Sequence, residues 1–298
     1  MLYAYAFIQN IELINKCKTK ERGKMNAILY TTIFIIGTLF GSFYTLAVYR
    51  IPRKKDITHT HSFCPNCNHK LGFFELIPVL SYIFLGGRCK NCKQKIRPRY
   101  LILEILSGIT FLIFAYIFKI DANNLDIYSI IKFSFFALYL CAIFIIAGIS
   151  KENKKIERSV LYYSLAVSLM YIIYLCIIEA ASIYRYAMYL IAIIIILIVD
   201  LHLLKEKADN NNKIEILMLI ILMSVFTGEF ATIMTLITTI IWSATVEAEK
   251  YIKNFLNKRK KEKMIFLRNI NIPFYLCVFN IVDTIFISLM KMIVTIHS

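Results

Sequence analysis

Four of the eight cysteines stand in two close pairs, and their spacing is that of a metal site. The pairs are Cys64-Pro-Asn-Cys67 and Cys89-Lys-Asn-Cys92, with 21 residues between them. Two C-x2-C knuckles that fold towards each other can place four thiolates around one tetrahedral zinc ion. Such a closed site would fold its segment rather than catalyse a reaction. The sequence therefore predicts a structural zinc site at Cys64, Cys67, Cys89 and Cys92.

Other interpretations of this segment remain open at the level of sequence. The four thiols could be free or redox-active instead of bound to metal. Basic neighbours favour thiolates, which are the metal-binding form; examples are Arg88, Lys90 and Lys93. Three nearby histidines are interpreted as solvated loop residues, because four cysteines already complete a tetrahedral set. These histidines are His59, His61 and His69.

Long apolar runs surround the cysteine pairs and must position them. Hydrophobic residues make up 59% of the chain, charged residues make up 18%, and the mean hydropathy is +0.64. This composition excludes a soluble domain and predicts an all-α polytopic membrane protein with about eight transmembrane helices. Seven runs are long enough to cross a hydrocarbon layer about 30 Å thick. They lie near residues 27–49, 100–118, 127–149, 160–180, 183–204, 230–248 and 273–295.

A shorter apolar run at 214–227 predicts the eighth helix. Short apolar pieces of this kind are typically buried among neighbouring helices. The pair Gly228-Glu229 follows it directly, which leaves room only for a tight turn before the next helix.

The distribution of Lys and Arg predicts the orientation. Of 35 basic residues, 26 lie in the segments 50–99, 150–159, 205–213 and 249–272, whereas the alternate segments hold two. Because basic residues accumulate on the cytoplasmic side, the chain is expected in the inner (cytoplasmic) membrane with its cysteine loop in the cytoplasm. The net charge of +16 is then a topology signal, and no nucleic-acid partner is expected. The basic run 258–263 should attract anionic lipid headgroups.

Residues 1–24 conflict with this orientation, because they carry five basic residues on the predicted external side. Either the segment 1–15 interacts with the membrane, or translation begins at Met25, immediately before the first apolar run. The charge distribution favours Met25. Residues 1–24 are therefore treated as an N-terminal extension.

Several motifs around the cysteines occur in a recognisable order. Together they resemble the type IV prepilin leader peptidase/N-methyltransferase family, densely over residues 37–106. The resemblance implies domains at 25–118, with the first helix, cysteine loop and second helix, and at 119–298, a six-helix peptidase-like membrane domain. The motifs are Gly41-Ser42-Phe43, Tyr49-Arg50-Ile51-Pro52, the two knuckles, Glu75-Leu76-Ile77-Pro78-Val79-Leu80-Ser81-Tyr82, Gly87-Arg88-Cys89, Ile96-Arg97-Pro98-Arg99-Tyr100 and Glu104.

The resemblance also implies an activity and partners. Members of this family cleave the basic leader peptide from type IV prepilins and pseudopilins, then methylate the new N-terminus with S-adenosylmethionine. Two aspartates at the membrane edge are attributed to proteolysis, because two carboxylates that share a proton can act as base and acid. The implied partners are prepilins or pseudopilins, membrane lipids, and pilus-assembly or secretion proteins.

This chain departs from the family at both aspartate positions. They fall on Ser150 and Lys213, neither of which can take the role of an aspartate. A shifted register offers Glu152 and Asp209 as substitutes, and Glu215 also flanks Lys213. The alternative interpretation, which we favour, is that these carboxylates are solvated charges at loop ends.

Three carboxylates lie within the predicted helices, where a charge is costly. Glu104 matches the family pattern. Asp200 is expected to snorkel or to pair with a lysine, whereas Asp283 is expected to be neutral or hydrogen-bonded inside the bundle.

Two functional hypotheses follow. The chain is either a prepilin-processing enzyme with displaced carboxylates, or a proteolytically inactive homologue that binds prepilins or assists pilus assembly. A protein that methylates without cleaving lies between them.

Overall fold

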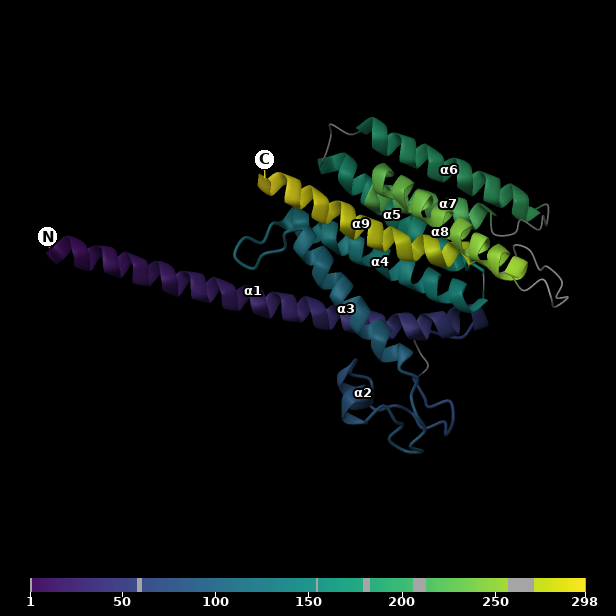
Figure 1. Ribbon diagram of the computed structural model, residues 1–298, viewed down its shortest axis with the longest axis horizontal. Helices are drawn as coiled ribbons and strands as arrows, with labels where there is room; N and C mark the ends of the chain where they lie inside the picture. The colour runs from purple at the N-terminus through teal and green to yellow at the C-terminus, as the bar shows by residue number, and fades with distance from the viewer. Residues whose placement is uncertain are drawn as a thin grey trace. The chain divides into compact units, whose positions relative to one another are not determined.

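The computed structural model describes residues 2–57, 61–153, 155–178, 183–205, 213–256 and 271–297 (Figure 1). Within these ranges the regular structure is helical, and two isolated β-bridges are the only strand-like pairings there. The predicted all-α membrane fold is confirmed. His59, Asp209 and the basic run 258–263 lie outside the described residues.

Seven of the described helices are long and apolar enough to cross a membrane. They agree with the seven long runs expected from the sequence. The complete set of described helices is α1 (Leu2–Arg50), α2 (Leu80–Phe84), α3 (Arg99–Ile117), α4 (Ile127–Asn153), α5 (Arg158–Ile178), α6 (Ile183–Lys205), α7 (Lys213–Thr227), α8 (Glu229–Leu256) and α9 (Ile272–His297), with 3-10 turns η1 (Ile51–Arg53) and η2 (Phe73–Glu75). The seven candidate spans are all the described α-helices except the short α2 and α7.

Helix α7 is the eighth element expected from the sequence, but it is too short to count as a span. Its 15 residues rise about 22 Å, less than the hydrocarbon thickness of about 30 Å. The helix contacts α5, α6, α8 and α9, and seven of its residues are buried. Gly228, with φ +83°, makes the expected tight turn into α8. The prediction of a buried short helix is therefore confirmed.

The chain divides into two compact units. The first holds residues 1–45 and 58–134, and the second holds residues 46–57 and 135–298. Helix α1 is continuous from Leu2 to Arg50, and no break marks Met25. The choice of Met25 as the start, and the domain boundary after residue 118, stay predictions.

Glycines let α1 and α3 approach closely in the first unit. A Cβ atom added at Gly41 would lie 2.7 Å from the Cα of Glu104, and one at Gly37 would lie 2.9 Å from the Cα of Gly108. Small residues that allow backbones to touch are a common means of packing membrane helices. This contact places Glu104, which anchors part of the cysteine loop.

We expect the substitution Gly41→Ala to lower stability by about 1–3 kcal/mol, because the new methyl group meets backbone that cannot move aside. Thermal unfolding in detergent is the measurement. Gly23→Ala is the matched control on the same helix, since nothing lies within 4 Å of the added atom. There the loss of a helical glycine should be neutral or stabilising by up to about 1 kcal/mol.

Aromatic stacking and a buried amide form the core of the second unit. The rings of Tyr139 and Tyr171 stack on Phe226, with centroids 4.7 and 5.0 Å away. The hydroxyl of Tyr139 donates to the side-chain oxygen of Asn280, which is fully buried. The amide of Asn280 in turn donates to Thr235 at 3.2 Å. These contacts tie α4, α5, α7, α8 and α9 together.

Candidate metal centre and membrane carboxylates

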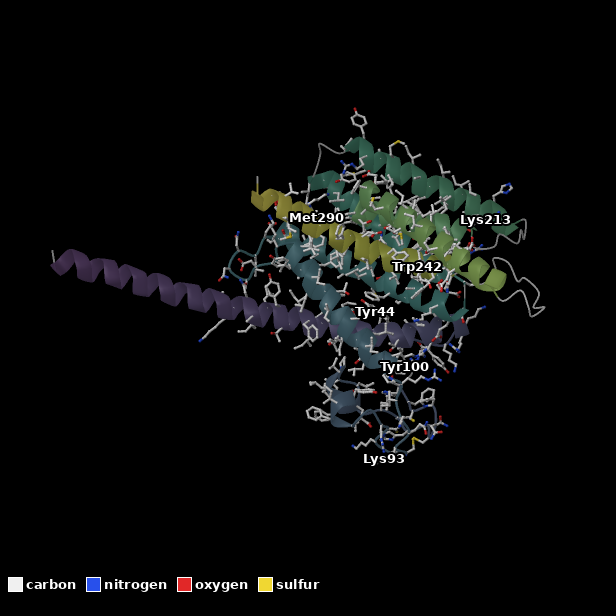
Figure 2. All side chains as sticks on the ribbon, in the orientation of Figure 1. Tyr44, Lys93, Tyr100, Lys213, Trp242 and Met290 are labelled. Atoms are coloured by element: carbon white, nitrogen blue, oxygen red, sulfur yellow. The ribbon has the colours of Figure 1, made fainter. Side chains whose placement is uncertain are left out.

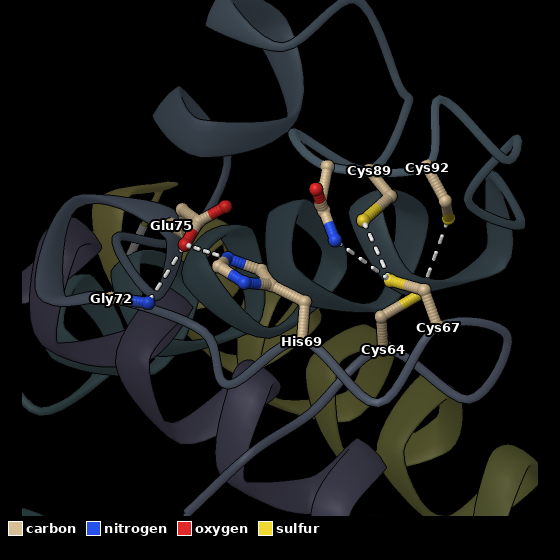
Figure 3. A network of polar contacts seen from close by, with 8 residues as sticks. Cys64, Cys67, His69, Gly72, Glu75, Cys89 and Cys92 are labelled. Atoms are coloured by element: carbon tan, nitrogen blue, oxygen red, sulfur yellow. Dashed lines mark hydrogen bonds and ion pairs between the residues drawn. The ribbon is translucent and has the colours of Figure 1, made fainter.

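The four paired cysteines converge as the sequence predicts (Figure 3). Their Sγ atoms all lie within 4.8 Å of one another. The shortest distances cross between the knuckles, 3.8 Å for Cys64 to Cys92 and 3.9 Å for Cys67 to Cys89. The four thiols are free and no disulfide joins them.

These distances fit a tetrahedral metal. Around an ion with metal–sulfur bonds of about 2.3 Å, neighbouring sulfur atoms are about 3.8 Å apart. The observed 3.8 and 3.9 Å agree with that spacing. The four-cysteine cluster can therefore hold a metal ion.

The two knuckles repeat the same backbone geometry with an offset of 25 residues. The N–H of Asn68 bonds the carbonyl of Cys64 at 2.9 Å, and the N–H of Lys93 bonds the carbonyl of Cys89 at 3.0 Å. Asn68 and Lys93 both have positive φ, 56° and 60°. A β-bridge closes each knuckle; the bridged pairs are Phe63 with Lys70 and Arg88 with Lys95.

Two asparagines link the knuckles, and our sequence interpretation missed them. Asn66 donates to Cys92 at 3.6 Å, and Asn91 donates to Cys67 at 3.8 Å. Each precedes the second cysteine of its own knuckle, and each reaches the second cysteine of the other. The repeated Asn-Cys pair was the sequence signal for this arrangement.

Hydrogen bonds, rather than the basic neighbours, set the thiol chemistry of Cys92. The backbone N–H of Gln94 and then the amide of Asn66 lower the pKa of Cys92 to about 6. For Cys67, the backbone N–H of His69 lowers the pKa, but burial and the adjacent thiols outweigh it and the pKa is raised. Cys92 is therefore the cysteine of this pair that exists as a thiolate near neutral pH.

In metal-free protein we expect iodoacetamide to modify Cys92 before Cys67 at pH 7, because the thiolate is the reacting species. The rate at Cys92 should rise with an inflection near pH 6, since its pKa is about 6. Mass spectrometry of peptides after timed alkylation measures both rates. Asn66→Ala should move the inflection to higher pH, and equal rates at the two cysteines would contradict the assignment.

His69 is not a solvated loop residue, and that expectation was wrong. Its Nε2 lies 3.2 Å from Glu75 Oε2, and the Glu75 side chain is 10% exposed. The same carboxylate accepts the N–H of Gly72 at 2.8 Å. These contacts, first that of Gly72 and then that of His69, lower the pKa of Glu75. The pair joins the first knuckle to η2.

The segment after η2 is fastened to α3. The backbone N–H of Val79 donates to Glu104 Oε2 at 2.8 Å. Val79 has φ 61° and ψ −54°, and across it the N–H of Leu80 bonds the carbonyl of Pro78 at 2.6 Å. This is a γ-turn with positive φ, a strained conformation for a β-branched residue. Glu104 therefore holds a strained turn at the start of α2.

Ser150, which the sequence predicts at the first aspartate position of the family, is fully buried and hydrogen-bonded. Its Oγ donates to the side-chain oxygen of Asn271 at 2.9 Å, and the amide of Asn271 donates to the carbonyl of Ser150. Asn271 thus ties the end of α4 to the residue before α9. Ser150 has a structural part in this unit.

The other residues considered for catalysis lie at or beyond helix ends. Glu152 is exposed at the end of α4, and Lys213 is exposed at the start of α7. Asp209, the second substitute, lies outside the described residues. The pairing of Glu152 with Asp209 therefore stays a prediction.

The structure instead brings together two carboxylates around an arginine. Arg158, the first residue of α5, lies 2.8 Å from Glu215 Oε1 and 3.8 Å from Asp200 Oδ1. The hydroxyl of Tyr162 donates to the other oxygen of Asp200. Asp200 is 1% exposed and Glu215 is 6% exposed. The expectation that Asp200 snorkels or pairs with a lysine was wrong.

This group, Arg158, Tyr162, Asp200 and Glu215, is called the arginine cluster below. One oxygen of each carboxylate, Asp200 Oδ1 and Glu215 Oε2, is buried without a hydrogen bond. Two carboxylates against one guanidinium leave a net negative charge in a place of low polarity. The signal for the cluster was the placement of Arg158 and Glu215 at helix starts and Asp200 near a helix end.

Asp283 has the environment expected of an intramembrane carboxylate. Its Oδ2 accepts a hydrogen bond of 2.9 Å from Thr238, which lies on α8. The expected hydrogen bond is confirmed, whereas Asp283 is half-buried and not enclosed in the bundle.

Comparison with known proteins places the first part of the chain. The bacterial peptidase A24 N-terminal domain matches residues 35–118, which include both knuckles and Glu104. The prepilin leader peptidase/N-methyltransferase of Myxococcus xanthus is 35% identical over 89 residues, 30% of this chain and 27% of the relative. The protein of that name from Vibrio cholerae is 36% identical over 86 residues, 26% of this chain and 34% of the relative.

A third relative of the same name, from Bacillus subtilis, is 39% identical over 83 residues, 28% of this chain and 34% of the relative. The chain therefore matches about a third or less of the length of these relatives. No solved structure matches the chain. Residues 35–118 are therefore similar to the N-terminal domain of bacterial A24 peptidases and to the matching part of these prepilin leader peptidase/N-methyltransferases.

Proposed function

We propose that this protein binds prepilins or pseudopilins through residues 35–118 in the cytoplasmic membrane and does not cleave their leader peptides. The relatives that match this region are named prepilin leader peptidase/N-methyltransferase. The observation that carries the proposal is the burial of Ser150, with its Oγ bonded to Asn271 at 2.9 Å, where the family has an aspartate. A buried hydroxyl with its proton donated to an amide oxygen cannot activate water.

The second family position supports the same conclusion. Lys213 is an exposed cation with no acceptor, so it cannot share a proton with a carboxylate. Glu215, two residues later, is committed to Arg158 at 2.8 Å. The Oε1 atom of Glu215 accepts a hydrogen bond from Arg158 Nε, so this oxygen is not available to a second carboxylate.

The four-cysteine cluster serves this proposal as a structural zinc site that folds the binding segment. The sulfur spacing, with four Sγ atoms within 4.8 Å of one another, supports zinc over a redox role. Zinc in a closed site of four cysteines stabilises the loop and takes no part in bond cleavage. The predominance of basic residues in this loop supports its cytoplasmic placement.

Leader cleavage is a second candidate function, favoured by one observation. Asp200 and Glu215 are buried on either side of Arg158, and each has one oxygen without a hydrogen bond. These two residues would then replace the family's aspartates, in place of Glu152 and Asp209. N-methylation with S-adenosylmethionine is the activity that can survive without any of these carboxylates.

A reconstituted cleavage assay decides between the candidates. The purified chain is incubated in proteoliposomes with a prepilin, beside one aspartate-bearing relative as a positive control. We expect the prepilin to be captured by cross-linking and to keep its leader, whereas the relative releases mature pilin. Mature pilin from this chain would overturn the proposal.

If cleavage is found, substitutions show which carboxylates are responsible for it. Loss of cleavage in Asp200→Asn and Glu215→Gln would identify the second candidate function, and loss in Glu152→Gln or Asp209→Asn would identify the substitutes suggested by the sequence. Transfer of a labelled methyl group from S-adenosylmethionine to pre-cleaved pilin tests the methyltransferase separately. Failure to capture prepilin at all would refute binding through residues 35–118.

A further inference from the structure

An exposed apolar patch covers part of the cysteine loop. It comes from η2 and α2, which contact each other, and its five large side chains are 50–84% exposed. The rings of Phe73 and Phe74, two of these side chains, pack edge to face with their centroids 5.7 Å apart. A loop that faced water would not expose this many apolar side chains within twelve residues. The apolar patch consists of Phe73, Phe74, Leu80, Ile83 and Phe84.

The apolar patch is fastened to the first turns of a candidate membrane span, α3. Val79, which separates its two halves, donates its N–H to Glu104 at 2.8 Å. Glu104 is the sixth residue of α3, so it lies about 7.5 Å along the helix axis from Arg99. Helix α3 is one of the candidate membrane spans, and Figure 1 shows α2 in the loop that leads into its N-terminal end. This depth matches the boundary between headgroups and acyl chains, where interfacial helices lie about 5–10 Å deep.

The strained γ-turn sets the direction in which α2 leaves this anchor. Val79 keeps a positive φ of 61° because Pro78, Leu80 and the Glu104 carboxylate each bond the turn. A strained backbone conformation persists only where several surrounding contacts hold it in place. Here the turn directs α2 so that Leu80, Ile83 and Phe84 are exposed together.

The charges around the apolar patch suit an anionic surface. Residues 61–98 contain six basic residues and one acidic residue, Glu75, which is engaged by His69 and Gly72. In Figure 2, Lys93 lies at the outer end of the loop and Tyr100 at the start of α3. Each basic residue near an anionic membrane surface adds attraction to its headgroups. The exposed cations are Lys70, Arg88, Lys90, Lys93, Lys95 and Arg97.

We infer that the apolar patch inserts into the headgroup–acyl boundary of an anionic lipid leaflet and that the basic residues of the loop bind its headgroups. The four-cysteine cluster is then held flat against the membrane surface instead of projecting into solvent. This inference goes beyond prepilin binding and does not depend on whether leaders are cleaved.

Tryptophan quenching in bilayers tests the inference. The single tryptophan is first removed with Trp242→Phe, and Phe74→Trp or Phe84→Trp is then added as a conservative reporter. The full chain is reconstituted into vesicles of phosphatidylcholine and phosphatidylglycerol that carry lipids brominated high in the acyl chain. We expect both reporters to be quenched by the brominated lipid and shielded from aqueous acrylamide.

Two matched reporters calibrate the result. Leu106→Trp, at a 47% exposed position on α3, reports contact with acyl chains. Asn124→Trp, at an exposed position between α3 and α4 and outside the cysteine loop, reports a water-exposed site. Reporters at 74 and 84 that behave like Leu106→Trp support the inference, whereas reporters that behave like Asn124→Trp overturn it.

The test also separates lipid from protein as the occupant. If the reporters at 74 and 84 are accessible to acrylamide in vesicles and become shielded only when prepilin is added, the apolar patch is a protein-docking surface and the inference is wrong. Replacing phosphatidylglycerol by phosphatidylcholine should weaken lipid quenching at 74 and 84 but leave Leu106→Trp unchanged. Equal quenching in both lipids would refute the part assigned to the basic residues.

Discussion

The double substitution Cys64→Ser and Cys67→Ser should unfold the cysteine loop and release its metal. Within the described residues 61–98, the buried positions are Cys64, Pro78, Gly87 and Cys89, so the loop has almost no apolar core of its own. A metal held by the four cysteines would supply most of its stability, since binding contributes about 10–16 kcal/mol in zinc-finger peptides. Metal analysis should fall from about one ion per chain to none, and proteolysis should cut between residues 61 and 98.

A matched control distinguishes metal binding from loss of any thiol. Cys176→Ser also removes a partly exposed cysteine, but on α5, outside the cluster. It should leave the metal content unchanged. Asn66→Ala and Asn91→Ala should retain the ion with weaker affinity, because these residues support sulfur ligands without binding the metal. Full metal content in the Cys64→Ser/Cys67→Ser protein would contradict the assignment.

Arg158→Met should destabilise the second unit by about 3–5 kcal/mol, since removing one partner leaves buried charge uncompensated. Asp200 and Glu215 are 1% and 6% exposed, and both depend on this guanidinium. Thermal unfolding in detergent at pH 7 measures the loss.

The control for this prediction neutralises the whole arginine cluster. Arg158→Met combined with Asp200→Asn and Glu215→Gln should recover most of the lost stability, because no unpaired charge remains. Arg185→Met is the matched surface substitution. Arg185 is 3.8 Å from Glu229, and both side chains are more than half exposed, so its loss should cost at most about 1 kcal/mol. Equal losses for Arg158→Met and Arg185→Met would show that the cluster is not electrostatically coupled.

The elements with strong local signals were predictable from the sequence. Each long helix follows from an apolar run, and the turn at Gly228 follows from a single glycine after a short run. The cysteine cluster was predictable because ligand type and spacing constrain a tetrahedral site. In these cases the residue types within one short segment are enough to determine the structure that the segment forms.

Other features depend on contacts between distant segments and were not predictable. Asp200 meets Arg158 and Tyr162 across 42 and 38 residues, and no local pattern reports such a pairing. His69 binds Glu75 only because η2 turns back towards the first knuckle. Of the apolar patch, only Leu80 lies in a quoted family motif, and the exposure of the five side chains can be seen only in three dimensions.

The shortness of α7 has a consequence for how the chain is made. A segment of 15 residues cannot span the bilayer at insertion, and its buried carboxylate, Glu215, adds a further cost to insertion. Gly228 joins it to α8 without a linker, so the two helices form one hairpin. We expect α7 to enter the membrane only together with α8, after α5 has been made and Arg158 is available to neutralise its carboxylate. Because α5 is synthesised before α7, Arg158 is already present when Glu215 enters the membrane and can pair with it.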